Sequence, residues 1–213
     1  MAITPESYRD IIYPTAATAK LIENLVSGAL RFPFTGKSGI LIYGKPGLGK
    51  STLAKLLPRD MQMVLHGDYL DPPSHYDVKA GSNGPAILNS LHAQAMNVNP
   101  HGVYKYFVLD EVDNLGAKTL ASLKVVLDIP DTVFIMTTNN VEDIPHPVIS
   151  RCHMVNMYPA NPEAYLPQAH ELLAYFGITS EVSDAALLPI ISACAGDIRQ
   201  IANQMQLLAL DLR

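Results

Sequence analysis

Residues 40–52 read ILIYGKPGLGKST. The four apolar residues at 40–43 predict a buried strand, and the apolar spacing that follows residue 52 predicts a helix. Between them, every fixed position of the pattern G-x-x-x-x-G-K-[ST] is filled, by Gly44, Gly49, Lys50 and Ser51. Glycine permits positive φ, so backbone N–H groups can converge on phosphate oxygens, which the N-terminus of the next helix also attracts. The segment therefore predicts a cradle for the phosphates of a nucleotide.

The chemistry expected at this loop is that of a magnesium nucleotide. Lys50 would neutralise the β and γ phosphates, and the hydroxyl of Ser51 would complete the shell of a Mg²⁺ ion. Further contacts to the nucleotide are expected from the rest of the loop and the start of the helix: Gly44, Pro46, Gly47, Leu48, Gly49 and Thr52. The alternative, a glycine-rich turn that binds nothing, is disfavoured because a strand and a helix flank the pattern.

Two carboxylates follow another apolar strand, at residues 104–109. Asp110 and Glu111 stand at its carboxyl end, where a parallel sheet places its ligands. Asp110 would hold the magnesium shell, and Glu111 would polarise the attacking water. Acids at a strand end often only solvate it, but a phosphate loop about sixty residues upstream favours the catalytic interpretation. Asn139 follows the strand at 132–137 and would orient the water, although an isolated asparagine there is more often a turn residue.

Two arginines are candidates for the cation that phosphoryl transfer needs at the departing charge. Arg151 lies in Ser150-Arg151-Cys152, and an arginine supplied by another subunit can raise the rate by about 10³ to 10⁵. Arg199 lies in Gly196-Asp197-Ile198-Arg199, where Asp197 is expected to cap the last helix. From there Arg199 could reach the γ-phosphate and couple the nucleotide state to the angle between two domains. An isolated arginine such as Arg151 is usually a solvated surface residue, and Arg199 by itself could equally be a surface residue of its helix.

Composition limits the class of protein. The chain has 213 residues, 48% of them apolar and 16% charged, with a net charge of −5 and a pI near 5.7. Its length fits a main domain with an appendage, and its negative charge means that any DNA contact is local or pooled over several copies. Cys152 and Cys194 lack metal-ligand spacing, which indicates a reduced intracellular protein without a zinc site. The absence of a signal or membrane-spanning pattern leads us to expect a cytoplasmic protein.

The order of predicted elements indicates an α/β fold. Strands are expected at 40–43, 62–66, 104–109, 132–137 and 153–157, alternating with helices at 15–30, 53–57, 85–97 and 117–127. The helix after the phosphate loop is expected to stop at Pro58, and residues 67–85 are expected to form a polar surface loop. Beyond Pro162 the patterns are helical, at 164–176, 185–195 and 198–212. We therefore expect a parallel sheet flanked by helices over residues 1–159 and a small helical lid domain over 160–213.

Taken together, these motifs resemble those of the AAA+ ATPases, and most closely those of the clamp-loader group of replication proteins. They stand in the family's order: Walker A (Gly44 to Ser51), Walker B (Asp110 and Glu111), sensor 1 (Asn139), Ser150-Arg151-Cys152 and sensor 2 (Arg199). The likeness covers nearly the whole chain. It implies a P-loop module with a five-stranded parallel sheet and a helical lid, which binds and hydrolyses ATP with Mg²⁺.

The resemblance also implies partners and further site residues. Arg151 would be a finger inserted in trans into the ATP site of a neighbouring subunit, in a homo- or hetero-oligomeric ring or spiral. An N-terminal segment would form the adenine pocket, with Tyr8, Arg9, Ile11 and Ile12. The expected partners are DNA and a replication or DNA-processing protein.

Departures from the family pattern leave alternatives open. His66 stands where the family often has an asparagine after the second strand. This puts in doubt whether the chain has the family's switch, which links DNA binding to Glu111. The Gly-Leu-Gly-Lys-Ser form of the loop is also similar to that of Holliday-junction motors and helicase loaders. The chain could be an ATPase motor of the clamp-loader kind or a monomeric P-loop protein. It could also be a nucleotide-gated scaffold, such as a helicase loader or a regulator of recombination or transposition, with weak or partner-dependent hydrolysis.

Overall fold

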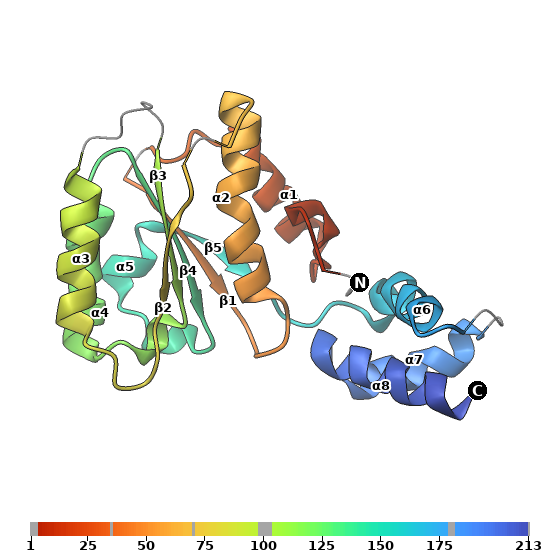
Figure 1. Cartoon of the computed structure of the whole chain (residues 1–213). Helices are drawn as coiled ribbons and strands as arrows, with labels where there is room; N and C mark the ends of the chain where they lie inside the picture. Colours follow the sequence, from red (N-terminus) through yellow and green to blue (C-terminus); the bar gives the residue numbers. More distant parts are fainter. Residues whose placement is uncertain (1–3, 35, 70, 98–103, 179–181, 213) are drawn as a thin grey trace.

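The computed structural model describes residues 4–34, 36–69, 71–97, 104–178 and 182–212. Within these ranges a larger α/β body is followed by a smaller group of helices, and an extended segment joins the two (Figure 1). In the same ranges, no helix combines the length and the apolar character needed to cross a bilayer.

Five strands form one parallel sheet in the described part of the chain: β1 (Gly39–Tyr43), β2 (Ser74–Asp77), β3 (Lys105–Asp110), β4 (Thr132–Thr138) and β5 (Cys152–Asn156). Their order across the sheet is β2-β3-β4-β1-β5. Helices α1 (Ala16–Val26) and α2 (Lys50–His66) cover one face, and α3 (Gly84–Met96), α4 (Ala117–Leu127) and α5 (His146–Ile149) cover the other (Figure 1). The predicted α/β class with five parallel strands is confirmed.

Alternate residues of each strand contribute to cores on opposite faces of the sheet. Ile40 and Ile42 pack under α1 and α2, whereas Leu41 packs under α3 and α4. Burial on both faces explains why β1 and β4 are continuous apolar runs rather than alternating ones. Alternate side chains of β1 therefore point away from α2 and are buried on the opposite face of the sheet.

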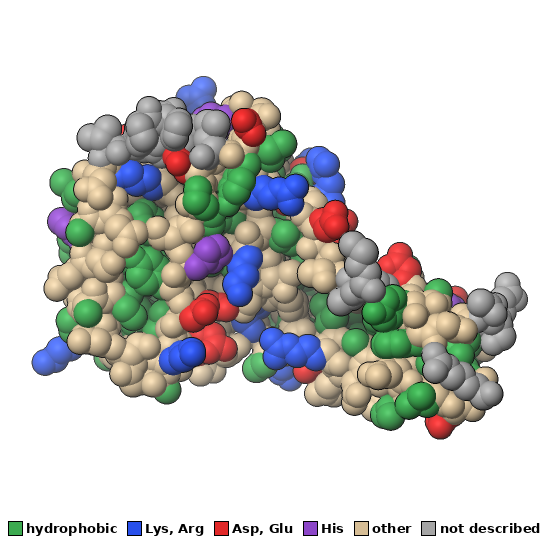
Figure 2. Space-filling model, viewed as in Figure 1, with side chains coloured by type: hydrophobic (Ala, Val, Ile, Leu, Met, Phe, Trp, Pro, Cys, Tyr) green, Lys and Arg blue, Asp and Glu red, His purple; other side chains and the backbone are tan. Residues whose placement is uncertain are grey.

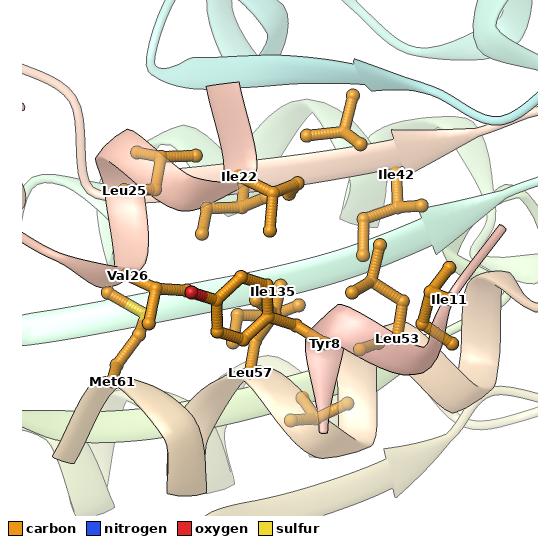
Figure 3. Packing of buried hydrophobic residues seen from close by; sticks show 14 of the residues in the cluster. Tyr8, Ile11, Ile22, Leu25, Val26, Ile42, Leu53, Leu57, Met61 and Ile135 are labelled. Carbon is orange, nitrogen blue, oxygen red and sulfur yellow. The ribbon is translucent and has the colours of Figure 1, made fainter. Parts of the chain in front are cut away.

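The N-terminal segment is anchored beside α2. Its 3₁₀ helix η1 (Tyr8–Asp10) places the ring of Tyr8 in the core beneath α1 and α2, where Figure 3 shows it beside Leu57 and Ile135. The backbone N–H of Tyr8 donates to the carboxylate of Asp60 on α2 at 2.7 Å. This segment is consequently held next to the helix that follows the phosphate loop.

Residues 58–66 differ from expectation. Helix α2 does not stop at Pro58 but continues to His66, and Gly67, with φ 74°, caps it. Residues 62–66 are the end of that helix and not a strand. A proline inside a helix removes one hydrogen bond, but Leu57 and Met61 on either side of it are fully buried, so tertiary packing outweighs the loss.

The second strand, β2, lies inside the predicted loop at 67–85. It is short, its side chains alternate between exposed and half-buried, and it forms the edge of the sheet beside β3. Such an edge strand carries a weak apolar signal, which explains why the pattern misses it. Since His66 ends a helix, it does not follow the second strand, but the residue that does is not an asparagine either, so the departure from the family pattern stands. The residue after β2 is Val78.

Past residue 159 the described chain is helical: η4 (Pro162–Tyr165), α6 (Leu166–Tyr175), α7 (Asp184–Ala193) and α8 (Ile198–Asp211). These helices share a core of their own, in which Ala169, Leu187, Ile201 and Met205 are fully buried. On the ground of this separate core we propose that the lid, residues 160–213, is a domain distinct from residues 1–159.

Candidate nucleotide-binding site

The loop between β1 and α2 contains three glycines with positive φ. The angles are 150° at Gly44 and 83° at both Gly47 and Gly49. A Cβ on Gly44 would clash with the carbonyl of Met157, and one on Gly47 would clash with the carboxylate of Asp197. Helix α2 begins directly after the loop, so its unpaired N–H groups face the same space. The loop is therefore closely packed between the end of the sheet and the lid, and its backbone is suited to an anion.

Lys50, the first residue of α2, is buried although it carries a charge; its exposed fraction is 7%. Its Nζ donates to the carbonyl oxygen of Lys45 at 2.7 Å and to Oδ1 of Asn139 at 2.9 Å. Burial lowers the pKa of Lys50, an effect that the carboxylates of Asp113 and Asp110 oppose. An incoming phosphate would compensate the desolvated ammonium group, so the geometry fits a phosphate-binding lysine.

Asp110 connects the end of β3 with the start of α2. The hydroxyl of Ser51 donates to Oδ1 of Asp110 at 2.8 Å. The hydroxyl of Thr137, from the neighbouring strand β4, makes a short hydrogen bond to the same oxygen and accepts from the backbone N–H of Glu111 at 2.9 Å. The sequence patterns do not reveal a role for Thr137, although it lies two residues before Asn139 at the same polar strand end.

The oxygens of Ser51 and Asp110 lie side by side and suit a magnesium ion. Mg²⁺ in nucleotide sites takes one or two protein oxygens and completes its octahedral shell with phosphate and water. Among the residues that the structure describes, no group of three or more His, Cys, Asp or Glu side chains could hold a metal by itself. The pair therefore fits Mg²⁺ that arrives with a nucleotide.

Glu111 adopts a left-handed backbone conformation, with φ 57°, just before the 3₁₀ helix η2 (Val112–Asn114). This conformation costs a non-glycine residue about 1–3 kcal/mol, and residues that adopt it cluster at functional sites. Nδ2 of Asn114 donates to Oε2 of Glu111 at 3.2 Å and to the carbonyl oxygen of Val78 at 2.8 Å. The carboxylate of Glu111 is therefore linked, through Asn114, to the segment that follows β2.

A cavity extends between the phosphate loop, the N-terminal segment and the lid. Of the residues predicted for the site, those that line it are Ile11, Ile12, Pro46, Gly47, Gly49, Lys50, Ser51, Thr52, Glu111, Asn139 and Arg199. Figure 2 shows the surface narrowing where the larger body meets the smaller one, with basic side chains gathered near the N-terminal end of α2. The cavity thus lies at the junction of the two bodies.

The lid is tied to the phosphate loop through the start of α8. The backbone N–H of Ile198 donates to the carbonyl oxygen of Gly47 at 3.1 Å. Asp197 caps the helix as expected, since its Oδ1 accepts from the N–H of Arg199 at 2.9 Å. Arg199 is exposed at the cavity wall, which is the geometry that a sensor of the γ-phosphate needs.

Six predicted residues do not line the cavity that the described residues form: Tyr8, Arg9, Gly44, Leu48, Asp110 and Arg151. The side chains of Tyr8 and Leu48 are buried in the core. The guanidinium of Arg9 is exposed and lies 5.3 Å from the centre of the Tyr8 ring. Conversely, the cavity is lined by five residues that the sequence patterns do not reveal: Pro5, Asp10, Thr137, Gln168 and Ile198.

Arg151 lies at the opposite end of the sheet. Its carbonyl oxygen accepts from the N–H of Gly39 at 3.0 Å, at the start of β1, whereas the phosphate loop follows the end of β1. Five strand residues extend about 16 Å, which is farther than an arginine side chain reaches. The guanidinium instead binds Asp128 in a bidentate manner, with Nε–Oδ1 2.7 Å and Nη2–Oδ2 2.9 Å, and Nη1 donates to the carbonyl of Pro147 at 2.8 Å. The hydrogen bonds from Arg151 lower the pKa of Asp128.

The chain is similar in sequence to known replication proteins. The chain is 26% identical over 209 residues to replication factor C small subunit 2 of Pyrobaculum islandicum, covering 96% of this chain and 61% of that protein. It is 23% identical over 204 residues to DNA polymerase III subunit gamma of Buchnera aphidicola, covering 86% and 53% respectively. The chain therefore spans about three fifths of the length of the replication factor C relatives that it matches.

The fold is also found in solved structures. A variant of RuvB from Thermotoga maritima superposes with a TM-score of 0.71 at 16% identity, covering 95% of this chain and 64% of that one. The sequence model of the ATPase family associated with various cellular activities (AAA) matches residues 40–159. Because this match covers more than half of the chain and includes the phosphate loop, the acidic pair and Arg151, the protein belongs to the AAA family of ATPases and is similar to clamp-loader subunits.

Proposed function

We propose that the protein is a Mg²⁺-dependent ATPase whose ATP sites are completed at the interfaces between protomers. It would use the cycle of binding and hydrolysis to load or remodel a partner in DNA replication or DNA processing, inside the cell. The observation that supports this most strongly is the separation of the expected site residues. Lys50, Asp110 and Asn139 meet at one end of the sheet, while Arg151 is held at the other.

Within one protomer, each residue at the loop has a distinct role. Lys50 would bind the β and γ phosphates, and Asn139, whose amide oxygen accepts a hydrogen bond from Lys50, would orient the attacking water. Ser51 and Asp110 would hold Mg²⁺, which when bound neutralises charge on the phosphates. Glu111 would accept a proton from the water.

The N-terminal segment and the lid would supply the remaining contacts to ATP. Ile11 and Ile12 line the cavity and would contact the adenine. Tyr8 and Arg9 would support this segment from the core and from its outer side, since neither lines the cavity. Arg199 would contact the γ-phosphate from the lid, so that loss of this phosphate loosens the lid.

Arg151 would act in trans. Since it cannot reach the phosphate loop of its own chain, a second copy or a related chain has to bring its arginine to this loop. Such an arrangement requires an oligomer, a ring or a spiral. The net charge of −5 makes binding of DNA by one protomer weak, and the similarity to replication factor C supports a DNA contact pooled over several subunits.

A direct test compares Glu111→Gln with Glu142→Gln, which makes the same chemical change at an exposed acid of η3 (Val141–Asp143). We expect Glu111→Gln to bind Mg²⁺-ATP normally in titration calorimetry and to lose nearly all phosphate release, by about 10² or more. Glu142→Gln should behave like the wild type. The wild-type rate per protomer should rise with protein concentration. Absence of Mg²⁺-ATP binding by the wild type would refute the proposed function.

A nucleotide-gated scaffold remains a second candidate, because Arg151 is already paired with Asp128 of its own chain. A scaffold would hydrolyse ATP only when a partner frees that arginine. Sedimentation with ADP or a slowly hydrolysed ATP analogue, with and without duplex DNA, distinguishes the two functions. A closed assembly of fixed size favours the motor, and a polymer of variable length favours the scaffold.

A further inference from the structure

Thr137 contributes a hydroxyl group to the buried interior of the sheet. It lies near the end of β4, and its side chain is fully buried. Because Met136 pairs with Leu109 of β3 in parallel register, Thr137 stands beside Asp110, the residue that follows Leu109. A β-branched residue suits a strand, so the feature that needs an explanation is the hydroxyl group and not the position in β4.

The hydroxyl group of Thr137 has a defined orientation. Its oxygen accepts from the backbone N–H of Glu111 at 2.9 Å, and it is hydrogen-bonded to Oδ1 of Asp110. An ionised carboxylate can only accept, so the single proton of the hydroxyl points to Asp110. Thr137 thus uses its donor on one residue of the acidic pair and an acceptor site on the other.

Thr132, at the opposite end of the same strand, makes a different kind of hydrogen bond. Its side chain is also buried, and its hydroxyl donates to the carbonyl oxygen of Ile129, three residues earlier, at 2.6 Å. Such a bond satisfies the hydroxyl within its own turn. The hydroxyl of Thr137 instead connects two strands at the place where the candidate magnesium ligands meet.

Asp110 receives two hydroxyl groups at the same oxygen. Ser51 donates to Oδ1 at 2.8 Å, and Thr137 is the second donor. Both side-chain hydrogen bonds that Asp110 makes with the described residues therefore go to Oδ1 and fix the rotation of the carboxylate. This arrangement leaves Oδ2 for a magnesium ion or for one of its water molecules. Residues that orient a metal ligand in this way tune the affinity of the site.

We propose that Thr137 is a positioning residue that sets the orientation of Asp110 toward Mg²⁺ and of the backbone at Glu111; this inference rests on the proposed function. The donor of the hydroxyl holds the carboxylate, and its acceptor site holds the left-handed backbone of Glu111, with φ 57°. Loss of the hydroxyl frees the carboxylate to rotate and removes the acceptor of the Glu111 N–H group.

The experiment replaces Thr137 by valine, which keeps the shape of the side chain but lacks the hydroxyl. Titration calorimetry measures the affinity of the full chain for a slowly hydrolysed ATP analogue, once with Mg²⁺ and once with EDTA. The wild type should bind more tightly with Mg²⁺. In Thr137→Val this gain should fall about 10- to 100-fold, as is typical when a residue that orients a metal ligand is lost. Affinity in EDTA should equal that of the wild type.

Two variants separate this role from a loss of packing. Thr137→Ser keeps the hydroxyl and should recover most of the gain from Mg²⁺. Thr132→Val makes the same chemical change in the same strand, far from the phosphate loop, and it should retain the gain. Amide hydrogen exchange supplies a readout without metal or nucleotide. The N–H of Glu111 should exchange faster in Thr137→Val than in the wild type, and Thr137→Ser should restore its protection.

Each outcome decides the inference. A gain from Mg²⁺ that is unchanged in Thr137→Val, or reduced equally in Thr132→Val, overturns the role of Thr137 and leaves the proposed ATPase standing. A wild type that binds the analogue equally well with and without Mg²⁺ overturns it too, whereas a wild type that binds no nucleotide refutes the proposed function as well. If thermal unfolding shows that Thr137→Val does not fold, Thr137→Ala is compared with Thr137→Ser, from which it differs only by the hydroxyl. The same loss of the gain is then expected in Thr137→Ala, and equal gains in the two variants overturn the inference.

Discussion

The two ends of the central sheet differ in how completely one chain builds them. At the carboxyl ends of β1, β3 and β4, hydrogen bonds of 2.9 and 2.8 Å already connect Lys50 with Asn139 and Ser51 with Asp110, respectively. At the amino ends, Arg151 is bound to Asp128 and faces no phosphate loop. The carboxyl end thus holds most of the residues that the proposed ATP site needs, and the amino end contributes a single cation, Arg151. The comparison supports the proposal that one chain binds the nucleotide by itself and that a second chain completes the reaction.

The largest expected effect comes from Arg151→Ala. It should lower ATP turnover by about 10³ or more, while calorimetry should show ADP binding as in the wild type, because the change is remote from the phosphate loop of its own chain. A mixture of Arg151→Ala and Glu111→Gln should regain activity, since the second variant supplies an arginine to the intact site of the first. Full turnover by a monomeric Arg151→Ala protein would contradict the division between the two ends.

Gly47→Ala should have the next largest effect, at the carboxyl end of the sheet. The residue has φ +83°, and a Cβ would clash with Asp197 of the lid. We expect nucleotide affinity to fall about tenfold or more, and stability to fall by about 1–3 kcal/mol. Gly81→Ala is the control, because Gly81 has the same φ of +83° with open space around its Cβ position. Equal losses in both variants would mean that the contact with the lid does not matter.

Asp128→Ala should act more weakly, at the amino end of the sheet. The bidentate pair uses two N–H groups of Arg151, and Pro147 takes a third, so two of the five donors remain for a phosphate. Loss of Asp128 removes this orientation, and since an exposed pair contributes about 1 kcal/mol or less, turnover should fall about fivefold at most. Asp143→Ala, at an exposed acid, is the control. A rise in turnover would instead show that Asp128 restrains the arginine.

The smallest effect is a change in titration. The hydrogen bonds from Arg151 lower the pKa of Asp128, so this pair stabilises the fold above the ordinary pKa of an aspartate and loses that contribution as the pH falls through the lowered value. In Arg151→Ala, the pKa of Asp128 should rise toward its usual range, as carboxyl ¹³C NMR would show. Glu23, whose pKa is lowered by Lys20, should titrate unchanged. If the pKa of Asp128 did not change in Arg151→Ala, the ion pair between the two residues would not persist in solution.

Much of the fold can be predicted from local sequence patterns, and the places where that prediction is wrong have physical causes. The buried strands β1, β3 and β4 are continuous apolar runs, which periodicity detects. Strand β2 is polar because it lies at the edge of the sheet, so its pattern is that of a loop. Pro58 predicts the end of a helix from local backbone chemistry, but the packing of the whole of α2 against the sheet overrides that preference.

The candidate site likewise has a part that the sequence predicts and a part that only the structure reveals. The sequence by itself determined the phosphate loop, the acidic pair and the two arginines, because these roles require particular residue types at fixed spacing along the chain. Only the tertiary structure decided that Thr137 joins Asp110 to Glu111, that Gln168 faces the cavity and that Arg151 lies a whole strand length from its own phosphate loop. Those relations depend on which strand ends and helices meet in space, and spacing along the chain does not contain that information.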